Sequence, residues 1–195
     1  MGRKISLIRK LTGCMPVQIS ETIMIYDFTL LTEVFRKLPD DSAERTARII
    51  KDHRRIFVYG AGCTGLILKA LAMRLSQAGR TVYVVGETVT PAVAADDLLL
   101  LASASGNTAS VCRYAQTARE LGADLLILTA SPKSKLTEIA PADVCFDTPH
   151  KDNGSSASSL MGTLFEQALL LYCDQMISSL GEDPAQMRKN HANLE

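Results

Sequence analysis

The feature that most constrains the fold is an alternation of short apolar runs with longer helical segments, which begins at Ile56 and continues through the centre of the chain. Such an alternation is typical of parallel strands joined by crossover helices. The apolar runs are 56–59, 81–85, 98–101, 125–129 and 144–146, and the helical segments are 64–78, 107–121 and 134–140. The pattern predicts an α/β fold of three layers, in which helices cover both faces of a five-stranded parallel sheet.

Helical segments also flank this centre. Apolar residues recur at steps of three and four over 17–38, which is the stripe of an amphipathic helix. A second helix is expected to begin at Asp41 or Ser42, both candidate caps, and to run to about His53. A long helix is expected over 160–180.

The chain length favours a single domain, because 195 residues with 47% apolar content can fill one core. We expect a flexible lead-in at 1–15, N-terminal helices at 17–54, the α/β core at 55–148, a loop at 149–159, and a C-terminal helix and tail at 160–195.

Composition argues against several classes of partner. The 21 basic and 21 acidic residues cancel, and no basic block stands out, so no nucleic-acid partner is expected. No apolar run approaches the ~20 residues of a membrane span, and the first 15 residues lack the continuous apolar core of a secretory signal. The five cysteines are scattered, with no C-x-x-C pair. We therefore expect no membrane partner, no metal site and a reducing, cytoplasmic location.

The segment Ser103–Thr108 is a candidate phosphate cradle. It follows the apolar run Leu98–Leu101 and leads into a helical segment, so hydroxyls, free backbone N–H groups and the positive end of a helix dipole would converge on one dianion. Helix capping would explain one hydroxyl. The three hydroxyls of Ser103, Ser105 and Thr108 exceed what capping requires, and they favour a phosphate, as on a sugar phosphate.

A glycine-rich turn at 60–65 also joins an apolar run to a helical segment. Its sequence fits the dinucleotide fingerprint G-x-G-x-x-G, and Glu87 lies at the distance where a ribose-binding acid would stand. The alternative is that the glycines only allow a tight turn and close helix packing. The second cradle favours a sugar phosphate over a dinucleotide, and Thr64 would add a fourth hydroxyl to the same site.

Further motifs extend the pattern along the chain. They are Tyr59-Gly60-Ala61-Gly62, Ala72-Met73-Arg74-Leu75, Val85-Gly86-Glu87-Thr88 with Thr90-Pro91, Met161-Gly162-Thr163-Leu164-Phe165-Glu166-Gln167 and the closing His191-Ala192-Asn193-Leu194-Glu195. Through these motifs, residues 17–195 resemble the SIS (sugar isomerase) domain superfamily, of flavodoxin-like nucleotide-binding topology. Within that superfamily the chain resembles the 6-phospho-3-hexuloisomerase family, to which the GETxTP, MG(S/T)LFEQ and HANLE motifs are the more specific.

The resemblance implies an enzyme of the ribulose monophosphate pathway of formaldehyde assimilation. Its reaction interconverts D-arabino-hex-3-ulose 6-phosphate and D-fructose 6-phosphate through a cis-enediol, with a carboxylate as the base and no cofactor. Glu166 would be that base, although its position alone would fit an acid in the first turn of a helix. His191 would be a second catalytic residue that reaches the site of a neighbouring subunit in a homotetramer, whose sites would lie near the interfaces.

The substrate would be held by one set of candidate residues: Gly62, Thr64, Glu87, Ser103, Ser105, Asn107 and Thr108. The chain departs from the family here. Cys63 and Thr64 stand where the family has Arg and Ser, and Ala104 and Asn107 interrupt the usual SGSGET. Another aldose-ketose isomerase, for example of arabinose 5-phosphate, and a non-catalytic sugar-phosphate sensor therefore stay open as alternatives. The carboxylate at Glu166 favours an enzyme.

Overall fold

The computed structural model describes residues 28–149 and 163–194. The predictions for the lead-in at 1–15, for the helix before Phe28, for the loop after Pro149 and for the helix start at 160–162 lie outside the described residues. The elements, in chain order, are α2 (Phe28–Arg36), α3 (Ser42–Asp52), β1 (Arg55–Gly60), α4 (Gly62–Gln77), β2 (Thr81–Val84), β3 (Leu98–Ser103), α5 (Ala109–Glu120), β4 (Asp124–Thr129), α6 (Lys135–Ile139), β5 (Val144–Cys145), α7 (Thr163–Ser179) and α8 (Pro184–Lys189).

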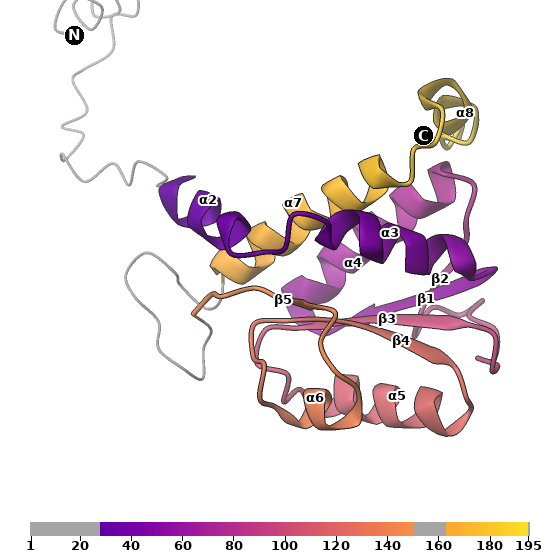
Figure 1. Ribbon diagram of the computed structural model, residues 1–195. Helices are drawn as coiled ribbons and strands as arrows, with labels where there is room; N and C mark the ends of the chain where they lie inside the picture. The colour runs from indigo at the N-terminus through magenta and orange to yellow at the C-terminus, as the bar shows by residue number, and fades with distance from the viewer. Residues whose placement is uncertain (1–27, 150–162, 195) are drawn as a thin grey trace, which may run out of the picture.

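The strands form a five-stranded sheet in the order β2-β1-β3-β4-β5, and all neighbours pair in parallel. Helices cover both of its faces (Figure 1), so the predicted three-layer α/β fold is confirmed. The chain steps from β1 to β2 in one direction and then returns past β1 to β3. The strand order therefore reverses between β1 and β3, and the crevice at their carboxyl ends is where sheets of this kind bind ligands.

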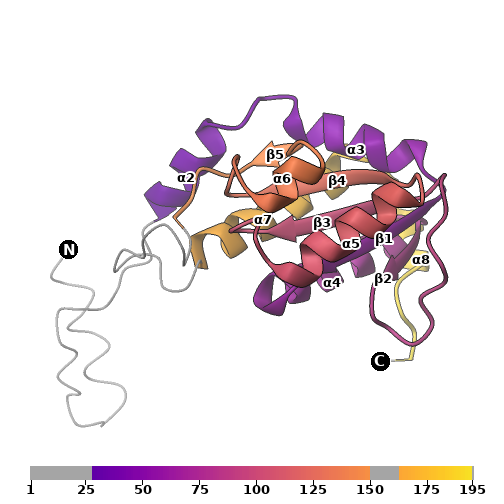
Figure 2. The ribbon, with the colours of Figure 1, turned by 90° about the horizontal axis from the view of Figure 1, so that it is seen from below.

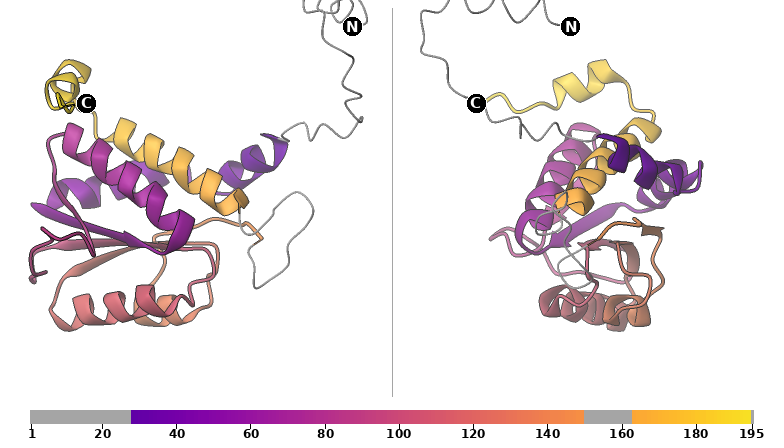
Figure 3. Two further views of the ribbon diagram at one scale, coloured as in Figure 1. Left: turned by 180° about the vertical axis from the view of Figure 1, so that it is seen from behind. Right: turned by 90° about the vertical axis from the view of Figure 1, so that its left-hand side faces the viewer.

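The two faces of the sheet are packed by different helices. Helices α3, α4 and α7 lie on one face, and α5 and α6 lie on the other (Figures 1 and 2). Successive side chains of a strand point to opposite faces, so the apolar core has two parts. Val58 and Leu100 pack in the part covered by α4 and α7, whereas Phe57 packs in the part covered by α5. Seen from behind, α4 and α7 run side by side across the sheet (Figure 3). Their first turns thus begin near the carboxyl edge of the strands.

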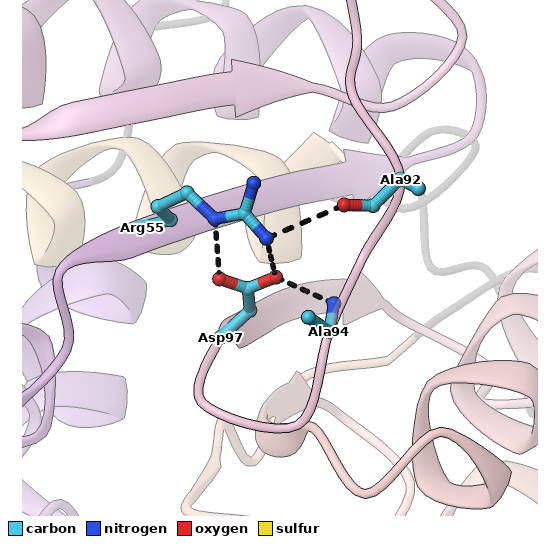
Figure 4. A network of polar contacts seen from close by, with 4 residues as sticks. All are labelled: Arg55, Ala92, Ala94 and Asp97. Carbon is cyan, nitrogen blue, oxygen red and sulfur yellow. Dashed lines mark hydrogen bonds and ion pairs between the residues drawn. The ribbon is translucent and has the colours of Figure 1, made fainter.

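An ion pair fastens the amino edge of the sheet. Arg55, the first residue of β1, donates from Nε and Nη2 to the two carboxylate oxygens of Asp97, at 2.7 and 2.6 Å (Figure 4). The backbone N–H of Ala94 also donates to Asp97, and Arg55 reaches the carbonyl of Ala92. Burial alone would raise the pKa of Asp97, but its hydrogen bonds with Arg55 and Ala94 outweigh burial and lower it. The loop before β3 is thereby held away from the carboxyl edge.

Helix α8 was not expected within the C-terminal tail. Its start carries a recognisable signal, because the Asp183 carboxylate accepts from the N–H of Ala185 and Pro184 occupies the first turn. None of the described helices is long and apolar enough to cross a membrane.

Candidate functional site

The predicted cradle joins β3 to α5 and brings its hydroxyls together. Ser103 Oγ lies 3.2 Å from Thr108 Oγ1 and accepts a hydrogen bond from the N–H of Gly106 at 3.1 Å. Ser105 Oγ accepts from the N–H of Asn107 at 3.2 Å. Thr108 stands at the N-cap of α5 without a side-chain capping bond, so capping does not account for its hydroxyl. The first N–H groups of α5 have no partner within the helix and face this loop.

The end of β4, the loop that follows it and α6 each donate to a carbonyl oxygen of the cradle. Thr129 Oγ1 donates to the carbonyl of Ser103 at 2.7 Å, Ser131 Oγ donates to that of Ala104 at 3.1 Å, and the N–H of Leu136 donates to that of Gly106 at 2.9 Å. Carbonyl oxygens repel an anion, whereas N–H groups attract it. The contacts turn the carbonyls of the cradle inward, which suits the loop to an anionic ligand.

Gly106 allows the two loops to approach closely. Its φ is +63°, and a Cβ on it would lie 2.1 Å from Ser134 Oγ. The neighbouring Asn107 ties the same loops together, because its side-chain Oδ1 accepts from the N–H of Lys135 at 3.2 Å. Direct substrate binding by Asn107 stays a prediction.

The glycine-rich turn after β1 packs strand and helix tightly. A Cβ on Gly65 would lie 2.3 Å from the carbonyl oxygen of Gly60, so no other residue fits there. Gly62 begins α4 with φ +60° and open space around it. The packing explanation thus accounts for Gly60 and Gly65, while ligand binding by Gly62 and by the buried Thr64 stays a prediction.

Glu166 lies in the first turn of α7 and is half-buried. The Cys63 thiol, in the first turn of α4, faces this carboxylate. Hydrogen bonding toward Glu166, with slight burial, raises the pKa of the thiol, so the thiol is protonated at neutral pH. Sequence reasoning missed this contact, because the two residues are distant in the chain and meet only through the packing of α4 on α7.

Glu87 lies beyond β2, at the outer strand of the sheet. Its carboxylate pairs with Lys69 of α4 at 2.6 Å, and both side chains are about half exposed. The pair borders a pocket of about 220 Å³ between the ends of β1 and β2 and helix α4. A substrate-binding role for Glu87 stays a prediction.

His191 follows α8, which lies beyond the C-terminal end of α7, whereas Glu166 lies at the N-terminal end of α7 (Figure 1). The side chain of the preceding Asn190 donates to the carbonyl of Gln77 at the end of α4, at 2.9 Å. The His191 ring is exposed, with Nδ1 3.1 Å from the carbonyl of Ala192. Within one chain the structure does not bring His191 to Glu166. Among residues 28–149 and 163–194, no group of three or more His, Cys, Asp or Glu is placed to hold a metal ion.

The parallel sheet between two helical layers is the fold of an SIS domain, and residues 49–171 match the SIS domain family. The chain belongs to this family. It is 41% identical over 165 residues to the 3-hexulose-6-phosphate isomerase of Mycobacterium gastri. The aligned region covers 82% of this chain and 83% of that enzyme. It is 38% identical over 165 residues to the enzyme of the same name from Bacillus subtilis, covering 81% and 89% of the two chains.

A solved structure agrees with these relatives. The chain superposes with a TM-score of 0.71 and 30% identity on a hypothetical protein from Methanococcus jannaschii, for which a molecular function of 3-hexulose-6-phosphate isomerase has been inferred. The match covers 86% of this chain and 94% of that one. The resemblance noted in the sequence is thus confirmed.

Proposed function

We propose that this protein is a 3-hexulose-6-phosphate isomerase, which interconverts D-arabino-hex-3-ulose 6-phosphate and D-fructose 6-phosphate. The relatives of that name support the proposal, since each aligns with more than four-fifths of the chain. The observation that carries it is the pairing of an anion cradle after β3 with a half-buried carboxylate, Glu166, at the start of α7.

The reaction moves a carbonyl between C3 and C2. The cradle residues Ser103, Ser105 and Thr108, with Thr64, hold the phosphate and so fix the carbon chain. Starting from the 3-ketose, the Glu166 carboxylate removes the proton on C2. The electrons of that C–H bond form the C2–C3 double bond, and the π pair of the C3 carbonyl moves onto O3, which takes a proton to give a cis-enediol. The proton on Glu166, or its replacement from solvent, then returns to C3 as the hydroxyl on C2 loses its proton, and the carbonyl is left at C2.

The test is proton NMR of fructose 6-phosphate incubated with the protein in deuterium oxide. Exchange of the hydrogen on C3 would support an enediol between C2 and C3. Exchange at C1 instead would identify an aldose-ketose isomerase, such as one acting on arabinose 5-phosphate, and would contradict the proposal. Binding without any exchange would indicate a sensor.

The active unit in this proposal is a homotetramer in which His191 acts in the site of a neighbouring subunit. Its support is twofold: His191 follows α8, at the far end of α7 from its own Glu166, and large apolar side chains are exposed on two neighbouring helices. These exposed side chains are Leu66 (65% exposed) and Met73 (50%) on α4, and Leu170 (40%) and Leu171 (45%) on α7. Light scattering that found a stable monomer would contradict the assembly and the shared role of His191 together.

The remaining parts of the proposal follow the family resemblance. We place the reaction in the ribulose monophosphate pathway of formaldehyde assimilation and in the cytoplasm. Purification of the activity from a soluble extract of the native cell, together with its loss on deletion of the coding sequence, would test both.

A further inference from the structure

Thr129, the last residue of β4, lies directly beneath the cradle. It is fully buried, at 0% exposed. Its hydroxyl donates to the carbonyl of Ser103 at 2.7 Å and accepts from the N–H of Ser131 at 3.1 Å. A Cβ built on Gly106 would lie 3.5 Å from the same oxygen. One hydroxyl therefore joins the start of the cradle to the loop that supports it.

These contacts fix the direction of a peptide group as well as its position. A buried carbonyl without a donor is costly, so the Ser103 carbonyl stays turned toward Thr129 while the hydroxyl is there. The peptide that follows Ser103 is then held with its oxygen inward. Without the hydroxyl, this carbonyl loses the donor that Thr129 supplies, and its peptide can turn toward solvent, the direction from which an anion approaches.

We propose that Thr129 is a positioning residue for phosphate binding. It touches no ligand, but its hydroxyl orders the Ser103–Thr108 backbone before the phosphate arrives. The inference rests on the proposed use of the cradle for a phosphate, and it adds a residue outside the cradle that sets its affinity.

The test compares three variants of the full chain. T129V keeps the shape of the side chain and removes the hydroxyl, whereas T129S keeps the hydroxyl and removes a methyl group. T46V is the matched control, because Thr46 is also 0% exposed and its hydroxyl also bonds buried partners, the carbonyl of Ser42 at 3.1 Å and the hydroxyl of Tyr172 at 3.1 Å. Those partners lie between α3 and α7 rather than in the cradle.

The measurement is isothermal titration with inorganic phosphate and with fructose 6-phosphate at constant ionic strength, alongside urea unfolding of each variant. We expect T129V to bind both ligands about tenfold more weakly, the usual effect of leaving one buried partner unpaired. We expect T129S to stay within about twofold of the unchanged protein. T46V should lose stability to urea as T129V does, yet bind phosphate normally.

Each contrary outcome overturns the inference in a distinct way. Normal binding by T129V would show that the cradle needs no such support. Equal losses in T129S and T129V would show that the hydroxyl is not the responsible group, and an equal loss in T46V would trace the effect to general stability. If the unchanged protein bound neither ligand, the proposed function would fail with it, whereas binding that T129V leaves intact overturns this inference alone.

Discussion

Replacing Gly65 by alanine should destabilise the protein through a collision of backbone with side chain. The new Cβ would lie 2.3 Å from the carbonyl oxygen of Gly60, more than 1 Å short of the 3.4 Å at which ordinary contact begins. That oxygen belongs to β1, which pairs with strands on both sides, so helix α4 must move instead. Overpacking of this kind costs about 1–3 kcal/mol, and the better helix propensity of alanine returns at most about 1 kcal/mol.

We therefore expect G65A to lower the free energy of unfolding by about 2 kcal/mol, or more if α4 cannot shift. Gly62 supplies a matched control on the same turn, because its φ is +60° but nothing lies within 4 Å of its Cβ position. G62A should cost only the strain of a left-handed alanine, about 1 kcal/mol.

Urea unfolding followed by circular dichroism, at one fixed protein concentration, measures both variants. The comparison of slopes matters as well as the midpoints, since an unchanged slope shows that the same surface is exposed on unfolding. The reasoning is refuted if G65A matches the unchanged protein, or if G62A is the less stable of the two. Either result would mean that the turn after β1 is not a packing contact, and a ligand role for its glycines would regain weight.

Three further predictions concern the two proposed catalytic residues and one ionisable contact. E166Q should lose well over ~100-fold in turnover with an unchanged KM for fructose 6-phosphate, because glutamine keeps the shape of the side chain but removes the proposed base. Near-normal turnover in steady-state assays would contradict the role of Glu166 as the base. H191A should lower turnover from saturating fructose 6-phosphate more than turnover in reverse, because only that ketose must open a ring; equal losses would favour an acid role in the enediol step. His53 faces two acceptors, the carbonyl of Ile49 at 2.7 Å and the carboxylate of Asp124 at 2.9 Å. Burial would lower its pKa, but these hydrogen bonds outweigh burial and raise the pKa above 6.5. The stability from protonated His53 is thus fully present below pH 6.5 and is lost as the pH rises through the raised value. Urea midpoints of H53Q and the unchanged protein should therefore converge between pH 6 and pH 9, and a constant difference would contradict this.

The strands and the cradle could be predicted because their signals are local. Leu98–Leu101 is apolar without alternation, as expected for a strand with helices on both faces, and it is indeed the central strand. The hydroxyls of Ser103 and Thr108 follow it at once, so their proximity required only the turn that a strand-to-helix junction makes.

The support of the cradle could not be predicted in the same way. Thr129 ends a strand, where threonine is common for its β propensity, and nothing near it in sequence marks its hydroxyl. Its contact with Ser103 exists because β3 and β4 are neighbours in register, a property of the strand order. The position of His191 likewise depends on α8 packing against α4, and α8 was not foreseen.

The structure also changes the meaning of the cysteine at position 63. In sequence, Cys63 reads as the loss of a cation that the family usually has beside its phosphate. In the fold its thiol faces Glu166, whose carboxylate raises the pKa of the thiol, so the group is neutral near pH 7. An uncharged group beside a carboxylate thus stands where the family usually has a permanent charge.

With cysteine in place of arginine at position 63, we expect the backbone of the cradle to contribute more to anion binding. Without an arginine at position 63, the proposed phosphate site depends more on the oriented N–H groups and hydroxyls of Ser103–Thr108 and on the start of α5. Such groups act only at contact distance and in the correct orientation, whereas a cation attracts from further away. Errors in loop geometry should therefore be more costly here than they would be with an arginine at position 63. Thr129, which fixes that geometry, should matter correspondingly more: restoring the cation with C63R should reduce the loss of phosphate affinity caused by T129V.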